Sequence, residues 1–162
     1  MNSIDGNKTK ELTLDDVEEV LALYQENERY FSYVKQIPDR KMVMEDMSEC
    51  PANVSKKDKH FIGFYHRSLY AVMDLVLNYP KEGEAFLGLF MVKQTLHHKG
   101  IGTKLIEELC EILKQNGIHA ISLGVISENQ EAIAFWDKMK FSITGEKMIT
   151  ERYVVEKRKR IL

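Results

Sequence analysis

Residues 92–109 mark a change from one kind of hydrophobic pattern to another. Before them, short apolar runs alternate with turn residues, whereas after them apolar residues recur every three or four positions. Short apolar runs bounded by turns predict strands, and the longer spacing predicts an amphipathic helix. Gly100 and Gly102 lie where the pattern changes. A chain in which a strand passes through glycines directly into a helix is restricted to folds that mix strands with helices.

The remaining patterns predict a mixed α/β sheet in a single domain that spans residues 1–162. Thr13 and Asp16 have the spacing of a capping box, which predicts a helix from there to about Gln25. The strand that ends at Val92 and the strand after the glycine helix should lie parallel and adjacent, with a right-handed crossover. Strands are predicted at residues 10–13, 60–66, 69–77, 84–92, 119–125, 141–147 and 152–157, and further helices at 27–35, 39–47, 101–117 and 128–139.

Composition excludes several classes of protein. The net charge of −2 gives no general attraction to nucleic acid or to an anionic membrane. No apolar run approaches the length of a membrane span, and no leader pattern is present, so we expect a cytoplasmic protein. Cys50 and Cys110 lack the spacing of metal ligands, so no metal site is predicted. A disulfide between them is possible but has no support in the sequence.

The glycines have two interpretations. Backbone N–H groups converge at the start of a helix, and the helix dipole adds partial positive charge, so the turn is suited to a phosphate group. Glycine lets that phosphate approach the backbone closely, and His97, His98 and Lys99 could add donors or charge. Alternatively, the glycines only permit a tight turn. A dinucleotide motif would need a third glycine where Leu105 stands, and the GxxxxGK(S/T) loop of nucleotide triphosphatases is missing.

Two stretches resemble the central motifs of the GCN5-related N-acetyltransferase (GNAT) superfamily. "FMVKQTLHHKGIGTKLIEEL" corresponds to a strand followed by a Q/R-x-x-G-x-G/A turn that opens a helix. "LGVISENQEAIAFWDKMKF" corresponds to a strand, an asparagine and the pattern A-x-x-F-Y-x-x-x-G-F. The motifs occur in the family's order over residues 88–141. The resemblance implies a mixed, mostly antiparallel twisted sheet with a central parallel strand pair splayed to hold coenzyme A, flanked by about four helices.

The resemblance also implies acetyl-CoA as cosubstrate and a primary amine, on a small molecule or a protein, as acceptor. The pyrophosphate would lie on the glycine turn, the end of the preceding strand would bond the pantetheine arm and the acetyl carbonyl, and the asparagine would reach the pantetheine. The positions so assigned to the cofactor are Phe90, Met91, Val92, His97, His98, Lys99, Gly100, Ile101, Gly102, Thr103, Asn129, Phe135 and Trp136.

Three positions depart from the family's motifs. His97 stands in place of the usual glutamine or arginine, and it can still donate a hydrogen bond. Lys140 replaces the usual glycine before Phe141. Trp136 occupies the position of a tyrosine proposed as general acid, and an indole N–H is not a usable acid. Either Trp136 is a core aromatic and the thiolate leaves unaided, since a thiol pKa is about 8.5, or another group supplies the proton.

The sequence does not identify the general base. Some family members use a glutamate on the strand before the glycine turn, but Phe86 stands at that position. Glu84 shares the strand face of Phe86, although it lies beside a turn. Asp74 stands alone in an apolar strand, where it is a base, a binder of the substrate ammonium or a structural hydrogen-bond acceptor. Tyr153 is either an acid in the cleft or an ordinary aromatic of the sheet.

Acceptor choice should depend on residues 24–51, because the family varies most there. Tyr30, Phe31 and Tyr33 with Glu45, Asp46 and Glu49 would form an aromatic and acidic wall suited to a cationic amine, or a packed helix pair with a solvated face. Direct transfer in a ternary complex is expected, since neither motif contains a cysteine. The alternatives are a catalytically weak or inactive CoA-binding regulatory module and a purely structural α/β domain. A homodimer is possible, and the acceptor and the acyl-chain preference stay open.

Overall fold

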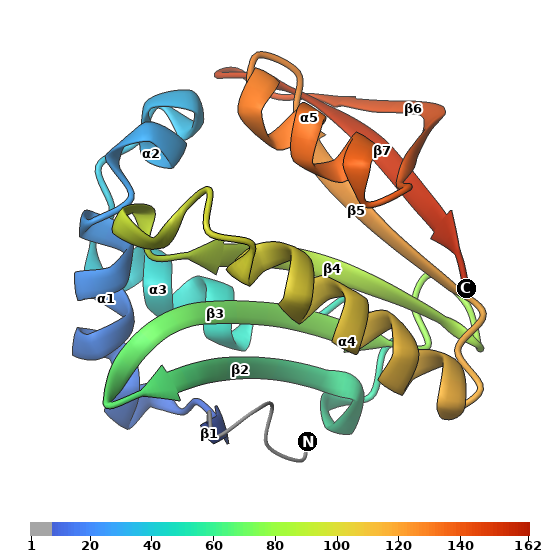
Figure 1. Ribbon diagram of the computed structural model, residues 1–162, viewed down its shortest axis with the longest axis horizontal. Coiled ribbons are helices and arrows are strands. Elements are labelled where there is room, and N and C mark those ends of the chain that lie inside the picture. The colour runs from blue at the N-terminus through green and yellow to red at the C-terminus, as the bar shows by residue number, and fades with distance from the viewer. Residues whose placement is uncertain (1–7) are drawn as a thin grey trace.

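One sheet of seven strands runs through the protein, in the order β1-β2-β3-β4-β5-β7-β6 (Figure 1). The computed structural model describes residues 8–162, so the first seven residues of the predicted domain lie outside it. The strands are β1 (Lys8–Glu11), β2 (Lys59–His66), β3 (Ser68–Leu77), β4 (Glu84–Val92), β5 (Ala120–Ile126), β6 (Ser142–Ile149) and β7 (Val154–Ile161). The α-helices are α1 (Val17–Gln25), α2 (Glu28–Val34), α3 (Arg40–Ser48), α4 (Ile101–Gln115) and α5 (Gln130–Lys138).

The strand pairing confirms the predicted architecture. Strands β2, β3 and β4 form an antiparallel meander, and β4 and β5, which flank α4, are the one parallel pair among the described strands. The described residues form five α-helices, as the local patterns predicted, whereas the family resemblance implied about four. Thr13 and Asp16 make the predicted capping box at the 3₁₀ turn that leads into α1.

The strands β4 and β5 stay together for only half of their length. Their parallel pairing covers Glu84–Leu87 of β4 and Ala120–Leu123 of β5. Beyond these residues β4 continues beside β3, whereas β5 continues beside β7. The sheet therefore opens between the carboxyl ends of β4 and β5, and Figure 1 shows β4 and β5 diverging below α2 and α5.

A separate hydrophobic core covers each face of the sheet. On one face α4 and α5 pack onto the strands through residues such as Ile106, Leu109 and Trp136. On the other face α1, α2 and α3 pack through residues such as Val20, Tyr24 and Val43. Figure 1 shows α4 in front of β3 and β4, with α3 behind them. Because the opening lies between the two halves of the sheet, helices from both layers border it.

The chain contains no long apolar helix and no disulfide among its described residues. Within residues 8–162, no helix has both the length and the apolar character required to cross a bilayer. Cys110 is buried in α4 and Cys50 follows α3, and both are free thiols. The disulfide that the sequence left open is therefore not formed.

The backbone conformation of Lys140 explains why the family usually has a glycine before the last phenylalanine of the second motif. It follows the C-cap of α5 with a φ of +66°, in the left-handed region. Its N–H donates to the carbonyl of Asp137 and the N–H of Phe141 donates to the carbonyl of Trp136, which is the Schellman arrangement. The rings of Trp136 and Phe141 pack edge to face, with centroids 5.0 Å apart. A glycine would adopt this backbone conformation without strain.

Replacing Lys140 with glycine should therefore stabilise the protein. We expect Lys140→Gly to raise the free energy of unfolding by about 0.5–1 kcal/mol, because relief of the left-handed strain exceeds the added entropy of the unfolded chain. The measurement is urea unfolding followed by circular dichroism. The matched control is Ala134→Gly at an exposed interior position of α5, which should lower stability by about 1 kcal/mol. Equal losses in both variants would show that Lys140 is not strained.

Candidate active site

The opening between β4 and β5 leaves backbone amide groups of β4 without a strand partner. The N–H of Lys93 donates to the carbonyl of Tyr70 on β3. In an antiparallel ladder alternate residues bond to the neighbouring strand, so Met91 also bonds to β3. Phe90 and Val92 then direct their amide groups into the opening. Of the three residues predicted to bind through the backbone, only Phe90 and Val92 therefore offer an N–H group. The amide of Met91 is engaged, and its side chain is buried in the core beside α1.

The beginning of α4 presents a second set of free amide groups. Gly100 is its N-cap with a φ of +78°, and no side chain caps the helix. The first N–H bonded back into the helix is that of Lys104, which donates to the carbonyl of Gly100. The N–H groups of Ile101, Gly102 and Thr103 therefore point out of the helix together. With the dipole of this 15-residue helix they make a favourable place for an anion.

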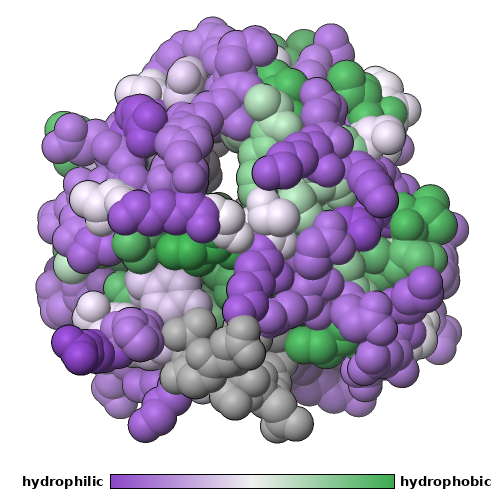
Figure 2. Space-filling model, in the orientation of Figure 1, coloured by the Kyte–Doolittle hydropathy of each residue, from purple (hydrophilic) through white to green (hydrophobic). Residues whose placement is uncertain are grey.

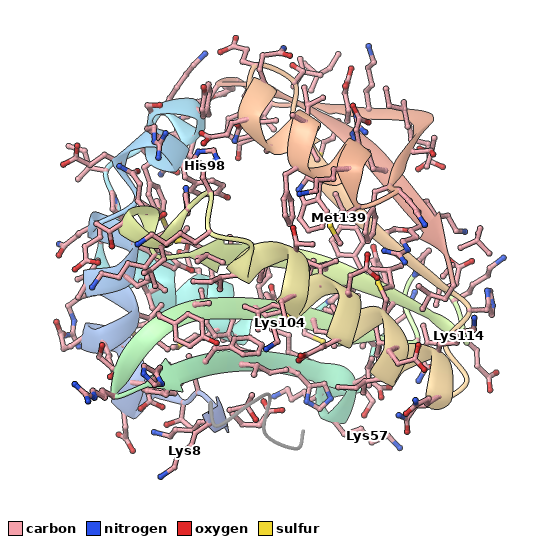
Figure 3. The ribbon with its side chains drawn as sticks, in the orientation of Figure 1. Lys8, Lys57, His98, Lys104, Lys114 and Met139 are labelled. Atoms are coloured by element: carbon pink, nitrogen blue, oxygen red, sulfur yellow. The ribbon has the colours of Figure 1, made fainter. Side chains whose placement is uncertain are left out.

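The two histidines of the turn have different roles. Nε2 of His97 lies 2.7 Å from the carbonyl oxygen of Val92, so His97 donates this bond and ties the turn to the end of β4. Nε2 of His98 lies 2.9 Å from Oε1 of Glu131 on α5, and Nη1 of Arg29 on α2 is 3.4 Å from the same oxygen. Figure 3 shows His98 between α2 and α5. Glu131 thus links helices on opposite sides of the opening, while Lys99 is exposed.

Aromatic side chains line the α4–α5 side of the opening. The rings of Phe90 and Phe135 are stacked with centroids 6.4 Å apart, and Trp136 packs edge to face against both. A Cβ on Gly102 would lie 3.4 Å from the Phe135 ring, so the helix start packs closely on this cluster. Trp136 is only 8% exposed and belongs to the core, which favours its interpretation as a core aromatic.

Asn129 is the N-cap of α5. Its side-chain oxygen accepts a hydrogen bond of 3.0 Å from the N–H of Ala132. The residue is buried at the end of β5, and its side-chain oxygen is engaged in starting the helix. Any bond from Asn129 to a cofactor would therefore come from its amide NH₂ group.

Asp74 belongs to a polar network on the α3 side of the sheet. Its Oδ1 lies 2.5 Å from Nζ of Lys59, whose side chain is 9% exposed. The same ammonium group donates to the backbone carbonyl of Asp46, and Oδ2 of Asp46 accepts from the hydroxyl of Tyr24 at 2.7 Å. Burial raises the pKa of Asp74, and the bond to Lys59 opposes that rise. The ion pair favours the structural interpretation of Asp74, although Oδ2 also lies against the bulge at Gly88 on β4.

A cavity of about 160 Å³ lies on this side of the opening. Its walls come from α1, α2, α3, β4, β5 and the turn before β7. The lining residues are Tyr24, Tyr30, Phe31, Val34, Gln36, Met42, Asp46, Leu89, Ile126 and Tyr153. Figure 2 shows a hollow between the part of the molecule that carries α2 and the part that carries α5.

The cavity brings three phenol groups and one carboxyl group together. Tyr153 faces it along with Tyr24 and Tyr30. Burial, together with the nearby charge of Asp46, raises the pKa of Tyr24 and of Tyr30, so both stay protonated, and the Tyr24 hydroxyl donates to Asp46. Of the aromatic and acidic wall considered from the sequence, Tyr33, Glu45 and Glu49 do not line the cavity.

Glu84 lies away from this site. It is the first residue of β4, eight positions before Val92, which corresponds to roughly 26 Å along an extended strand. Its carboxylate pairs with Lys159 at 2.8 Å and with Lys81 at 3.6 Å, and the bond from Lys159 lowers its pKa. The structure gives Glu84 a place in an ion-pair cluster and does not bring it to the opening.

Other residues at the site carried no clear signal in the sequence. Lys59 begins an ordinary strand pattern, and Arg29 and Glu131 belong to polar helix faces. Their partners lie 15 and 102 residues away in the chain, so only the tertiary structure identifies them. The lone aspartate in an apolar strand was the one hint that such a network exists.

Comparison with known families agrees with this geometry. Residues 20–141 match the acetyltransferase (GNAT) family. The chain belongs to this family. The match includes β2 to β5 with α4 and α5, and therefore both strands of the opening. Comparison with curated protein sequences yields no significant match.

Solved structures share the GNAT fold over nearly the whole chain. An acetyltransferase from Thermus thermophilus is 17% identical, with a TM-score of 0.78 over 96% of this chain and 97% of that one. The PaiA N-acetyltransferase from Thermoplasma acidophilum, solved in complex with coenzyme A, is 19% identical with a TM-score of 0.65 over 96% and 99%. The ribosomal-protein-S18-alanine N-acetyltransferase from Escherichia coli is 16% identical with a TM-score of 0.69 over 96% and 93%.

The pair of Lys59 and Asp74 can be tested by removing one charge at a time. Lys59→Met leaves a half-buried carboxylate without its cation, so we expect a loss of roughly 3 kcal/mol in the free energy of unfolding at pH 7.5. The double change Lys59→Met with Asp74→Leu should recover most of that loss. Lys41→Met, at an exposed lysine of α3, is the control and should have little effect.

The loss in Lys59→Met should also depend on pH. The folded pKa of Asp74 is raised, so its protonated form is favoured on folding, and stability falls as pH rises through that pKa. The loss should therefore be larger at pH 7.5 than at pH 5, because lowering the pH favours the protonated form of Asp74. Urea unfolding at both pH values measures this. A loss independent of pH would indicate that packing, and not the charge of Asp74, is responsible.

Proposed function

We propose that this protein transfers an acetyl group from acetyl-CoA to a primary amine, directly within a ternary complex. The observation that supports this most is the convergence of two sets of free amide groups on one opening. The helix start at Ile101–Thr103 is suited to a pyrophosphate, and the strand end at Phe90 and Val92 is suited to the amides of a pantetheine arm. A ligand that carries both a pyrophosphate and a pantetheine arm would engage both sets of amide groups.

Acetyl-CoA would supply an activated acyl group, a thioester whose carbonyl carbon accepts a nucleophile. One of the two N–H groups of Phe90 and Val92 could bond the pantetheine arm, and the other could bond the acetyl carbonyl oxygen as it gains negative charge. The acceptor would approach from the cavity between α2 and β5. Its amine nitrogen would form the new C–N bond, the C–S bond would break, and the proton released by the amine would pass to a base or to water.

The position of the thiols supports direct transfer. Cys110 is buried in α4 and Cys50 lies after α3, and neither lines the cavity. No thiol among the described lining residues is therefore placed to carry an acyl group. We propose Tyr153, which lines the cavity, as the proton donor for the departing thiolate, because Trp136 is a core aromatic. Cytoplasmic location and a possible homodimer stay predictions from the sequence.

Thermal unfolding tests the cofactor site. Acetyl-CoA at 100 times its dissociation constant should stabilise the protein by about 2.7 kcal/mol, or roughly 5–10 °C for a domain of this size. ATP should not reproduce the shift. Gly102→Glu should abolish it, because the new carboxylate would occupy the anion site. The matched control is Gly102→Ala, whose Cβ would lie at contact distance from Phe135 and should be tolerated. If acetyl-CoA does not raise the unfolding temperature of the native protein, the glycines only permit a tight turn and the proposed cofactor site is wrong.

Turnover separates an enzyme from a CoA-binding regulatory module. The protein should release free CoA thiol from acetyl-CoA when a panel of primary amines is added, and mass spectrometry should detect the acetylated amine. Tyr153→Phe should lower kcat about 10- to 100-fold without changing the stabilisation by acetyl-CoA, because general acid catalysis contributes at least this much. Stabilisation by acetyl-CoA with no turnover of any amine would favour the regulatory module.

A further inference from the structure

The cavity beside the opening contains one carboxyl group that forms no salt bridge within residues 8–162. Of the ten residues that line it, only Asp46 is ionisable near neutral pH. Oδ2 of Asp46 accepts from the Tyr24 hydroxyl at 2.7 Å, and no salt bridge to its carboxylate occurs among the described residues. The nearby ammonium of Lys59 bonds the backbone carbonyl of Asp46 instead and pairs with the carboxylate of Asp74.

This arrangement is unfavourable for the protein on its own. Burial raises the pKa of Asp46, and the nearby charges of Glu49 and Glu45 add to that rise, whereas the Tyr24 bond and the charge of Lys59 oppose it. A desolvated carboxylate costs free energy unless a cation or several donors satisfy it. Asp46 is nevertheless held firmly, because Tyr24, which donates to its carboxylate, is only 1% exposed. The backbone carbonyl of Asp46 also accepts a hydrogen bond from Lys59. A fixed, partly desolvated anion that faces a cavity is a suitable site for a cation.

The walls of the cavity indicate what the rest of the ligand is like. Tyr24, Tyr30, Phe31 and Tyr153 present rings, and aliphatic side chains from β4 and β5 close the remainder. Aromatic faces attract cations and pack well against flat apolar groups. The volume of about 160 Å³ is below the roughly 300–1,000 Å³ of pockets for drug-sized ligands. An amino group with one ring or a short alkyl chain fits, whereas a long peptide does not.

We propose that Asp46 binds the ammonium group of the acceptor, and that the acceptor is a small cationic amine with an aromatic or short apolar body. This proposal rests on the transferase function proposed above, for which it names the class of acceptor. The Tyr24 hydroxyl and Lys59 position Asp46 for this contact. Leu89 on β4 and Ile126 on β5 line the same cavity, so the cavity reaches the opening between these two strands. An amine held by Asp46 would therefore lie beside the opening.

The first test measures binding, so that it does not depend on turnover. The protein saturated with CoA is titrated calorimetrically with 2-phenylethylamine, with 2-phenylethanol as the neutral counterpart and with 3-phenylpropionate as the anionic one. We expect the amine to bind at least tenfold more tightly than the alcohol, and the carboxylate not to bind. This comparison uses the unaltered protein, so a folding defect cannot affect it. Equal affinity for amine and alcohol, or preference for the carboxylate, would overturn the proposal.

The second test places the effect on Asp46. Asp46→Asn keeps the size of the side chain and removes its charge, so it should raise the dissociation constant of 2-phenylethylamine at least tenfold and leave that of 2-phenylethanol unchanged. Stabilisation by acetyl-CoA should be the same as in the native protein, which also shows that the variant is folded. Glu45→Gln, at the preceding exposed residue of α3, is the matched control and should bind the amine normally. An unchanged dissociation constant in Asp46→Asn would refute the role of Asp46.

Turnover then distinguishes this proposal from the transferase function itself. If amines are acetylated, Asp46→Asn should raise KM for 2-phenylethylamine at least tenfold, whereas acetylation of peptide amino termini and of no small amine would overturn the proposed class of acceptor. If the amine binds through Asp46 and no amine is acetylated, the binding site is correct and the transferase function is wrong.

Discussion

The divergence of β4 and β5 after Leu87 is the constraint on which the site depends. A strand in the middle of a sheet normally bonds on both sides, so its amide groups are unavailable to a ligand. Here β4 loses its β5 partner where the parallel pairing stops, while β3 continues to hold its other side. The exposed amide groups are therefore fixed in place without help from any side chain. The turn between β4 and α4 is fixed as well, because His97 bonds the last carbonyl of β4.

In the proposed function, one helical layer would bind the cofactor and the other would bind the acceptor. On one face, α4 supplies the anion site and α5 supplies the aromatic cluster around Phe135. On the other, α1, α2 and α3 supply the rings and the carboxyl group of the acceptor cavity. Glu131 on α5 bonds both Arg29 of α2 and His98 of the turn, so the two sides are also linked directly across the opening. Cofactor and acceptor would thus meet at the one place where neither layer closes the sheet.

The polar groups buried near the site are connected by a series of hydrogen bonds and one ion pair. Lys59 neutralises Asp74, the backbone of Asp46 accepts from Lys59, and Tyr24 donates to the carboxylate of Asp46. Each group but the last is satisfied within the chain. Glu84, by contrast, pairs with two lysines at the far end of β4. If Asp46 binds the acceptor as proposed, the buried charge that functions is the one that lacks a salt bridge.

The order of strands and helices, the parallel pair and the glycine turn could be predicted from the sequence, because each rests on local periodicity or on residues with special backbone freedom. Gly100 adopts the left-handed conformation that the helix start requires, and the Gly117 that follows α4 has a positive φ as well. The acceptor side could not be predicted in the same way. Asp46, Tyr24 and Lys59 lie on three elements that meet only when α3 packs beside α1 and onto β2 and β3, and whether a carboxylate there is exposed or desolvated depends on that packing. Local spacing determined where the chain turns from strand to helix and thus where a phosphate is predicted to bind, and the tertiary structure decided which buried charge lacks a salt bridge.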